Sequence, residues 1–302
     1  MLDLDQAPFV KHQTHYFPDG NIILVAETTL FRFYRGILES HSEMMRDMFT
    51  LCSNAVSSAN GIDIDAGGAD DLPQTYDSVP VIRLHDSPED VIHLLRTILP
   101  HLANFTDNLN MLDSVGRLAN KYMFHKLEAW TKAQVITRYS WTYQRIKEDP
   151  SLVVLPDWED SVKLLHLCNT LGCAEAIPLV FFDLAWYRTP KRHDIKHRLQ
   201  TLRSDDIALL MVGQAQIQGL CNRIATRWSE GANYSSCKGS REKCALKGWC
   251  ILAQGKIQLW CDAAEGKGNS GLCASCDKFL AGHCETALQE LVKKIPQFFA
   301  PI

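Results

Sequence analysis

The sequence predicts an α+β N-terminal domain followed by an all-α C-terminal domain with a cysteine-rich end, on three observations. Short strand-length apolar segments are interleaved with helical patterns over about the first 140 residues. Further along the chain, apolar residues recur at the spacing of helix faces. Eight of the eleven cysteines lie between Cys221 and Cys284. We place the domain boundary between residues 145 and 146.

The first expected elements are two strands that pair as a hairpin. Ile22–Val25 is a continuous apolar run of strand length. Phe31 and Phe33 alternate with polar neighbours, which is the two-residue period of a strand. Glu27-Thr28 is the expected hairpin tip between them, and a third strand is predicted over 79–84.

Helical spacing begins at Ile37 and continues through Met44/Met45 to Phe49, so the sequence predicts one helix there. The Gly-, Ser- and Asp-rich stretch at about 54–78 is expected to be an acidic flexible loop. Ser87 precedes Pro88 and Asp90 in a capping box, which predicts the start of a further helix. Two more helices follow before residue 140.

The segment "FRFYRGILESHSEMMRDMF", residues 31–49, resembles the core of a BTB (POZ) domain of the fungal type. The positions that match the family pattern are Phe31, Tyr34, Arg35, Leu38, Ser42, Met45 and Phe49. Tyr34 stands where the family usually has His, and Met45 where it usually has Phe. The likeness continues to about residue 140, and it implies that Phe31, Leu38, Met45 and Phe49 pack the domain interior.

The resemblance implies a non-enzymatic protein–protein interaction module that self-associates as a homodimer and recruits protein partners in regulation. Family members also bind transcriptional co-regulators or the cullin scaffold of a ubiquitin ligase. Cullin-binding relatives often carry a hydrophobic-x-Glu motif after this helix, whereas this chain has "TLCSNAVSSANG" there. We therefore expect a generic interaction module rather than a ligase adaptor.

Residues 146–302 resemble the helical extension that follows the BTB domain in many fungal members. The extension contains a basic stretch between Arg188 and Arg203. A nucleic-acid-binding regulator would need such charges on one face, interleaved with aromatic side chains. A solvated loop between helices is the preferred interpretation, and nucleic acid is not an expected partner.

The cysteine-rich segment 221–284 suggests a metal site. Cys273 and Cys276 form a C-x-x-C pair, the spacing that lets two thiolates bind one tetrahedral metal, and Cys237 and Cys244 are separated by six residues. We predict a structural zinc site made by these four residues. Substitute ligands are Cys250, Cys261, His283 and Cys284. The alternatives are thiols that only pack between helices, or a redox or metal-dependent protein that uses the cluster.

The bulk composition excludes several other classes of protein. The net charge of −4 argues against a basic nucleic-acid footprint over the whole chain. No apolar run approaches the roughly 20 residues of a membrane span, and the N-terminal residues lack signal-peptide order. We therefore expect a cytoplasmic or nuclear protein. Gly266–Gly271 fits G-x-G-x-x-G, but no βαβ pattern surrounds it, so no nucleotide cofactor is predicted.

Overall fold

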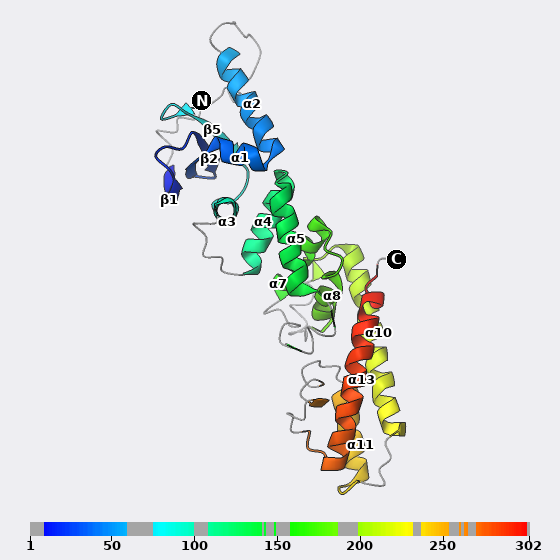
Figure 1. Ribbon diagram of the computed structural model, residues 1–302. Helices are drawn as coiled ribbons and strands as arrows, with labels where there is room; N and C mark the ends of the chain where they lie inside the picture. Colours follow the sequence, from blue (N-terminus) through cyan, green and yellow to red (C-terminus); the bar gives the residue numbers. More distant parts are fainter. Residues whose placement is uncertain are drawn as a thin grey trace. The chain divides into compact units, whose positions relative to one another are not determined.

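The computed structural model divides into two compact units, Met1–Gln134 and Val135–Ile302 (Figure 1). The division falls within helix α5 (His125–Tyr139), a little before the boundary predicted at residues 145 and 146. The structure describes residues 9–58, 75–99, 108–140, 142, 148, 158–186, 199–231, 237–253, 260, 263–264 and 270–300.

The N-terminal unit contains a five-stranded mixed sheet. Its strands are β1 (Val10–Tyr16), β2 (Ile22–Ala26), β3 (Thr29–Phe33), β4 (Thr75–Tyr76) and β5 (Val79–Leu84), in the order β1-β3-β2-β5-β4. β2 and β3 pair antiparallel, and the predicted tip at Glu27 and Thr28 connects them. Glu27 has φ 50°, the left-handed backbone conformation that such a tight turn requires. β1 pairs parallel with β3, and β5 pairs parallel with β2.

Strand β2 is buried on both of its faces. Ile22, Leu24 and Ala26 belong to the main core of this unit. Ile23 and Val25, which point to the opposite face because strand side chains alternate, belong to a second and smaller cluster. A central strand covered on both sides needs a continuous apolar run, and this explains why residues 22–26 show no polar alternation.

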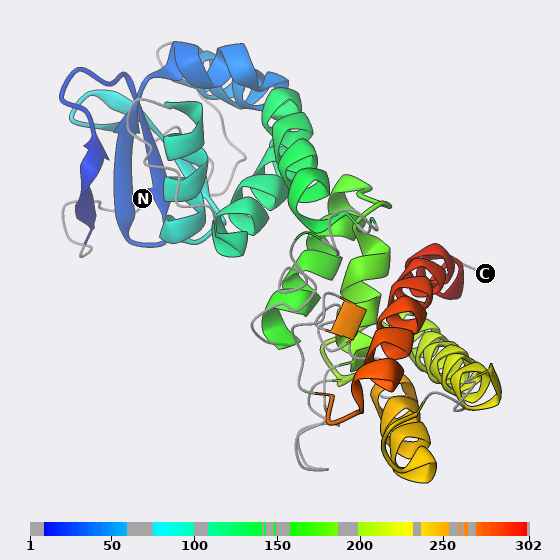
Figure 2. The ribbon, with the colours of Figure 1, turned by 60° about the horizontal axis from the view of Figure 1, so that its bottom comes forward.

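Helices cover the main core of the sheet. They are α1 (Arg35–His41), α2 (Glu43–Ser58), α3 (Pro88–Ile98), α4 (Leu109–Lys121) and α5. Figure 2 shows α3 lying along the sheet, and its Val91, Leu94 and Leu95 are buried in the same cluster as β2. The predicted cap of α3 is confirmed, because the Ser87 hydroxyl accepts the Asp90 backbone N–H at 3.1 Å.

The single helix predicted from Ile37 to Phe49 is wrong, because the chain breaks at Ser42 into α1 and α2. Ser42 has extended backbone angles, φ −142° and ψ 121°. Its hydroxyl accepts the Met45 backbone N–H at 2.9 Å and donates to the Tyr122 carbonyl at 2.5 Å. The side chain therefore caps α2 and ties the break to the end of α4. Both helices still direct apolar residues inward, so the core predicted for them is retained.

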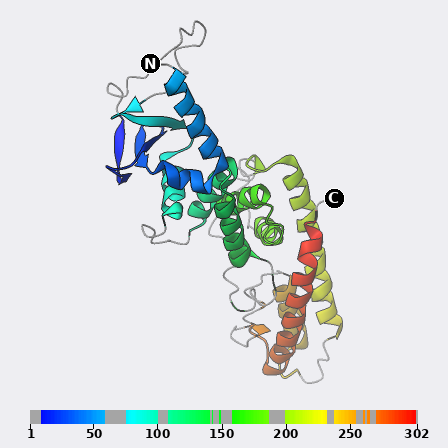
Figure 3. The same cartoon turned by 45° about the horizontal axis from the view of Figure 1, so that its top comes forward.

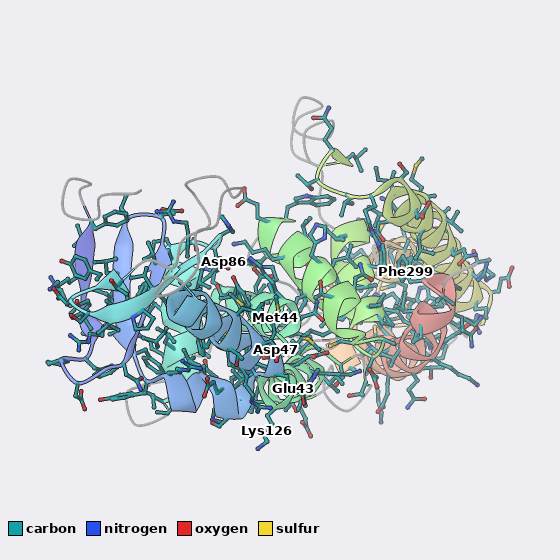
Figure 4. The ribbon with its side chains drawn as sticks, turned by 90° about the horizontal axis from the view of Figure 1, so that it is seen from above. Glu43, Met44, Asp47, Asp86, Lys126 and Phe299 are labelled. Carbon is teal, nitrogen blue, oxygen red and sulfur yellow. The ribbon has the colours of Figure 1, made fainter. Side chains whose placement is uncertain are left out.

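The four residues that the family resemblance places in the core lie in one cluster. Phe31, Leu38, Met45 and Phe49 are each at most 1% exposed. Next to them, the Tyr122 hydroxyl donates to Asp86, which is labelled in Figure 4, and Lys121 pairs with the same carboxylate at 2.7 Å. Burying each large apolar side chain contributes roughly 1.5–3 kcal/mol, so this cluster is a main source of stability for the unit.

The loop predicted at 54–78 is too wide at both ends. α2 continues to Ser58, and Thr75–Tyr76 form strand β4 against β5. Residues 59–74 lie outside the described part of the chain. β1 was not predicted at all, because of its seven residues only His15 is buried. Its place in the sheet depends on β3 rather than on an apolar pattern of its own.

In its described segments, the C-terminal unit has only helices as regular structure, in agreement with the predicted all-α domain. These are α7 (Trp158–Leu171), α8 (Ile177–Trp186), α10 (Ser204–Gly231), α11 (Arg241–Ala253) and α13 (Ala274–Phe298). Across both units, none of the helices in the described residues has the length and apolar character needed to cross a membrane.

Close contacts at glycines join the long helices of the C-terminal unit. α10 and α13 run side by side (Figure 3), and the Phe299 ring packs directly over Gly213, where a Cβ atom would clash with it. Phe299 also stacks on Phe181 of α8, with ring centroids 5.2 Å apart. At the other end of α10, the fully buried Trp228 packs over Gly248 of α11 in the same way. The packing of large rings directly against glycines therefore sets how closely these helices approach one another.

A histidine pair occupies the buried side of β1. His15 is 2% exposed, and its Nδ1 lies 2.8 Å from the Thr14 hydroxyl and 3.2 Å from Nδ1 of His12. Its Nε2 atom has no hydrogen-bond partner within the described residues. Burial lowers the pKa of His15 to about 4, and His12 and Arg96 add to the effect because their positive charges disfavour another one.

We expect Leu38→Asp to unfold the N-terminal unit. The substitution places a carboxylate at a position that is 0% exposed, and it should cost about 3 kcal/mol or more. Ala133→Asp is the matched control, because Ala133 is exposed on α5 within the same unit, and it should change stability by less than about 0.5 kcal/mol. Thermal unfolding and amide hydrogen exchange measure both. Wild-type behaviour of Leu38→Asp would contradict the core described here.

We also expect acid to destabilise the N-terminal unit through His15. Its pKa is about 4 in the folded chain against 6.5 for the ordinary value, so the unfolded chain binds the extra proton first. Stability is therefore complete above about pH 6.5 and falls as the pH drops towards 4, by on the order of 2 kcal/mol. Urea unfolding across this range should show a shallower pH slope for His15→Gln. Equal slopes would show that His15 does not carry the effect.

Candidate metal centre

Four cysteines from the starts of two helices form the candidate metal centre. Cys237 precedes α11, and Cys244 lies in the first turn of that helix. Cys273 is the N-cap residue of α13, and Cys276 lies in its first turn. Each helix start therefore supplies one cysteine from the segment before it and one from its first turn.

The four sulfur atoms of this cluster all lie within 4.8 Å of one another. The Sγ atoms of Cys237 and Cys273 are 3.6 Å apart. Zinc–sulfur bonds of about 2.3 Å in a tetrahedron place the sulfurs about 3.8 Å apart. Shifts of about an ångström or less would therefore give this set tetrahedral geometry, so the residues fit a zinc ion.

The surroundings of Cys273 favour its thiolate form. The backbone N–H groups of Cys276 and Lys238 lie beside the Cys273 sulfur and favour its charged form. Together with the neighbouring Cys276 and Cys237 thiols, they lower the pKa of Cys273 to about 6. The N-terminus of α13 also carries partial positive charge. A cysteine binds a metal as its thiolate, so Cys273 is already ionised for binding near neutral pH.

The second cysteine of the C-x-x-C pair has the opposite tendency. Burial raises the pKa of the Cys276 thiol, and hydrogen bonds with the neighbouring cysteines add to this. Several thiolates cannot share one small, partly buried space unless a cation offsets their charge. A bound divalent metal would remove this conflict and release the thiol protons.

The turn that leads into Cys273 is fixed from both helices. Lys247 of α11 donates to the Gly271 carbonyl at 2.9 Å, and Gly271 has φ 64°, a conformation that favours glycine. The Ser270 hydroxyl donates to Asp277 of α13 at 2.5 Å and accepts the Leu272 backbone N–H at 3.1 Å. The C-x-x-C pair is therefore held next to α11 by contacts that do not involve sulfur.

A set of four cysteines would act as a structural rather than a catalytic metal site. Four protein ligands complete the tetrahedral coordination of zinc and leave no position for a water or a substrate. Cys244 and Cys276 are buried, at 5% and 6% exposed, and the other two are half-buried. The cysteines whose side chains the structure describes are all free thiols, so no disulfide among them takes the place of a metal.

The structure separates the four predicted ligands from most of their proposed substitutes. Cys250, His283 and Cys284 are described but do not belong to the cluster. The His283 ring instead lies 4.3 Å from the Phe279 ring, between centroids. Cys261 lies outside the described residues.

Sequence analysis missed a second pair of thiols, at Cys168 and Cys173. Both are 0% exposed, and the Cys173 backbone N–H donates to the Cys168 carbonyl at 2.8 Å. A hydrogen bond with the Cys173 thiol, together with burial, raises the pKa of Cys168. Neutral buried thiols of this kind pack as small apolar side chains. The short spacing of the two residues was the one available signal.

Two other sequence features lie mainly outside the described residues. These are residues 187–198, with most of the basic stretch, and residues 265–269 of the glycine-rich segment. Within the described part, Arg203 forms a bidentate ion pair with the Asp206 carboxylate, at 2.7 and 2.9 Å.

Comparison with known proteins gave no match, whether to protein-family profiles, to curated sequences or to solved structures.

We expect the protein, purified without added metal, to contain about one equivalent of zinc. Cys273→Ser removes one ligand and should lose the metal, whereas Cys250→Ser removes a cysteine of α11 outside the cluster and should retain it. Elemental analysis gives the stoichiometry of each variant.

A chelator should loosen the C-terminal unit and leave the N-terminal unit intact, because metal binding at such a site is coupled to local folding. Hydrogen exchange of the α11 and α13 amides reports the first effect, and exchange of β2 and β3 reports the second. A metal-free wild type that is fully folded would mean that these thiols only pack.

Proposed function

We propose that the chain is a non-enzymatic interaction protein, built from a BTB-like N-terminal module and a helical extension that contains a structural zinc site. The observation that carries the first half is the order of elements around one core. A β2–β3 hairpin leads into α1 and α2, then β5, then α3 to α5. Phe31, Leu38, Met45 and Phe49, the apolar positions of the BTB-like pattern, meet in that core.

Self-association through the N-terminal unit is the proposed mode of action. β1 is an edge strand of the sheet, and its Val10 is 63% exposed. Leu51 on α2 and Met123 after α4 are also exposed, at 71% and 43%. An edge strand and apolar side chains left in water are features that a second copy can cover in a symmetric dimer. Recruitment of a regulatory protein partner is the second part of this proposal.

The metal centre is proposed to support this role rather than to perform chemistry. Zinc would join the starts of α11 and α13 and so fix the helices of the extension. A redox protein based on the same cysteines is the alternative, and it is favoured by the 3.6 Å approach of the Cys237 and Cys273 sulfurs, with the lowered pKa of Cys273 in support. Zinc content separates the two, because a metal-bound thiolate is not free to exchange. A reducing compartment, the cytoplasm or the nucleus, suits both readings of the free thiols.

We expect the full chain to form a weak homodimer at tens of micromolar, measured by light scattering. Val10→Glu combined with Leu51→Glu should weaken the dimer at least about tenfold, because both carboxylates would lie in the proposed interface. Met211→Glu is the control, since Met211 is 65% exposed but belongs to the C-terminal unit. A monomeric wild type would contradict the proposed dimer, but it would not contradict the fold described above.

A further inference from the structure

A groove runs between α10 and α13 on the surface of the C-terminal unit. It consists of two adjoining hollows of about 510 and 380 Å³, and Arg227 of α10 and Glu290 of α13 line both of them. The two helices lie side by side along this line (Figures 1 and 3). Neither hollow includes a cysteine of the metal cluster.

The walls of the groove carry an excess of positive charge. Among the described lining residues, Arg223 and Arg227 come from α10 and Lys278 comes from α13, against a single carboxylate, that of Glu290. That carboxylate is already paired, with Arg227 and with Lys294 at 3.0 Å. Within the described residues, neither Arg223 nor Lys278 makes an ion pair. Two cations on opposite walls are therefore available to an anionic partner.

The base of the groove is apolar. Ile224 and Ala287 are 4% and 2% exposed, and the Phe279 ring is 37% exposed beside them. Phe279 is held in place by ring contacts with His283 and with Trp228, at 4.3 and 5.0 Å between centroids. At Gly282, a Cβ atom would meet no other atom within 4 Å, so this residue leaves open space beside the ring.

We propose that this groove binds an acidic amphipathic segment of a partner protein. Carboxylates of the segment pair with Arg223 and Lys278 on the two walls, and an apolar side chain enters the space at Gly282 against Phe279. Charge complementarity sets the orientation, and the apolar contact supplies the buried area. This surface belongs to the helical extension alone, so it stands independently of self-association through the N-terminal unit.

A nucleic-acid strand fits this groove less well. Strand binding requires a continuous track of cations and several exposed aromatic faces for stacking. Here the carboxylate of Glu290 lies in the middle of the track, and Phe279 is the only exposed aromatic ring among the described lining residues.

The test is fluorescence anisotropy on the full chain, with a short labelled peptide in which leucines are flanked by glutamates. Its twin carries glutamines in place of the glutamates, and an oligothymidine strand is the third probe. The acidic peptide should bind most tightly. Arg223→Glu with Lys278→Glu should weaken its binding at least about tenfold. Lys126→Glu, at an exposed position of α5 labelled in Figure 4, is the single charge-reversal control and should change affinity by less than about twofold.

Gly282→Leu separates groove binding from general charge attraction. The new side chain alters no charge and meets open space, so the helix should form while the hollow is filled. We expect Gly282→Leu to weaken the binding of the acidic peptide by about tenfold as well. Circular dichroism checks the fold of each variant, and Lys278→Gln replaces the double variant if that variant unfolds. Equal binding of the glutamine twin, an unaffected Gly282→Leu or tighter binding of the oligothymidine strand would each overturn the proposal.

Discussion

The burial of β2 on both faces is the constraint on which the N-terminal unit depends. This strand is paired along both edges, with β3 and with β5, and all five of its residues are at most 1% exposed. Two separate layers of side chains must therefore cover it. Helices α1 to α4 provide one layer, and Leu30, Val79 and half-buried aromatic residues of the sheet provide the other. With each large side chain contributing roughly 1.5–3 kcal/mol, the rest of the unit is organised around this strand.

The C-terminal unit depends instead on contacts between helices that are distant in sequence. Trp228 over Gly248 joins α10 to α11, and Phe299 over Gly213 joins α10 to α13. The starts of α11 and α13 then meet at the cysteine cluster. Rings packed on glycines set the distance between the helices. The hydrogen bonds of the turn at Ser270 and Gly271 then hold the cysteines at the start of α13 close to those of α11. The same pairing of α10 with α13 creates the basic groove.

The sequence predicts those parts of the structure that depend on local pattern. The β2–β3 hairpin and helix α3 follow from apolar periodicity, a tight turn and a capping serine, and the structure confirms them. β1 could not be predicted in this way, because its mostly polar residues pair with β3 through the backbone. The break at Ser42 depends on a hydrogen bond to Tyr122, which is remote in sequence, so helix periodicity alone could not reveal it.

The metal cluster could be predicted only in part for the same reason. Cys273 and Cys276 form a C-x-x-C pair that the sequence reveals. The wider spacing of Cys237 and Cys244 identifies them as ligands only once α11 and α13 bring all four sulfurs together. The groove gave no local signal at all. Arg223, Lys278 and Glu290 are ordinary surface residues in the sequence, and they form one site because two helices place them together.

Because Cys244 and Cys273 lie next to each other, the chain between them forms a closed loop. It leaves and returns at sulfur atoms less than 5 Å apart, whatever its own length. Doubling the length of such a closed loop costs only about 0.6 kcal/mol in closure entropy. A change in the length of that chain is therefore limited less by closure entropy than by Trp260, which is 0% exposed and donates its Nε1–H to the Ile251 carbonyl of α11 at 3.1 Å.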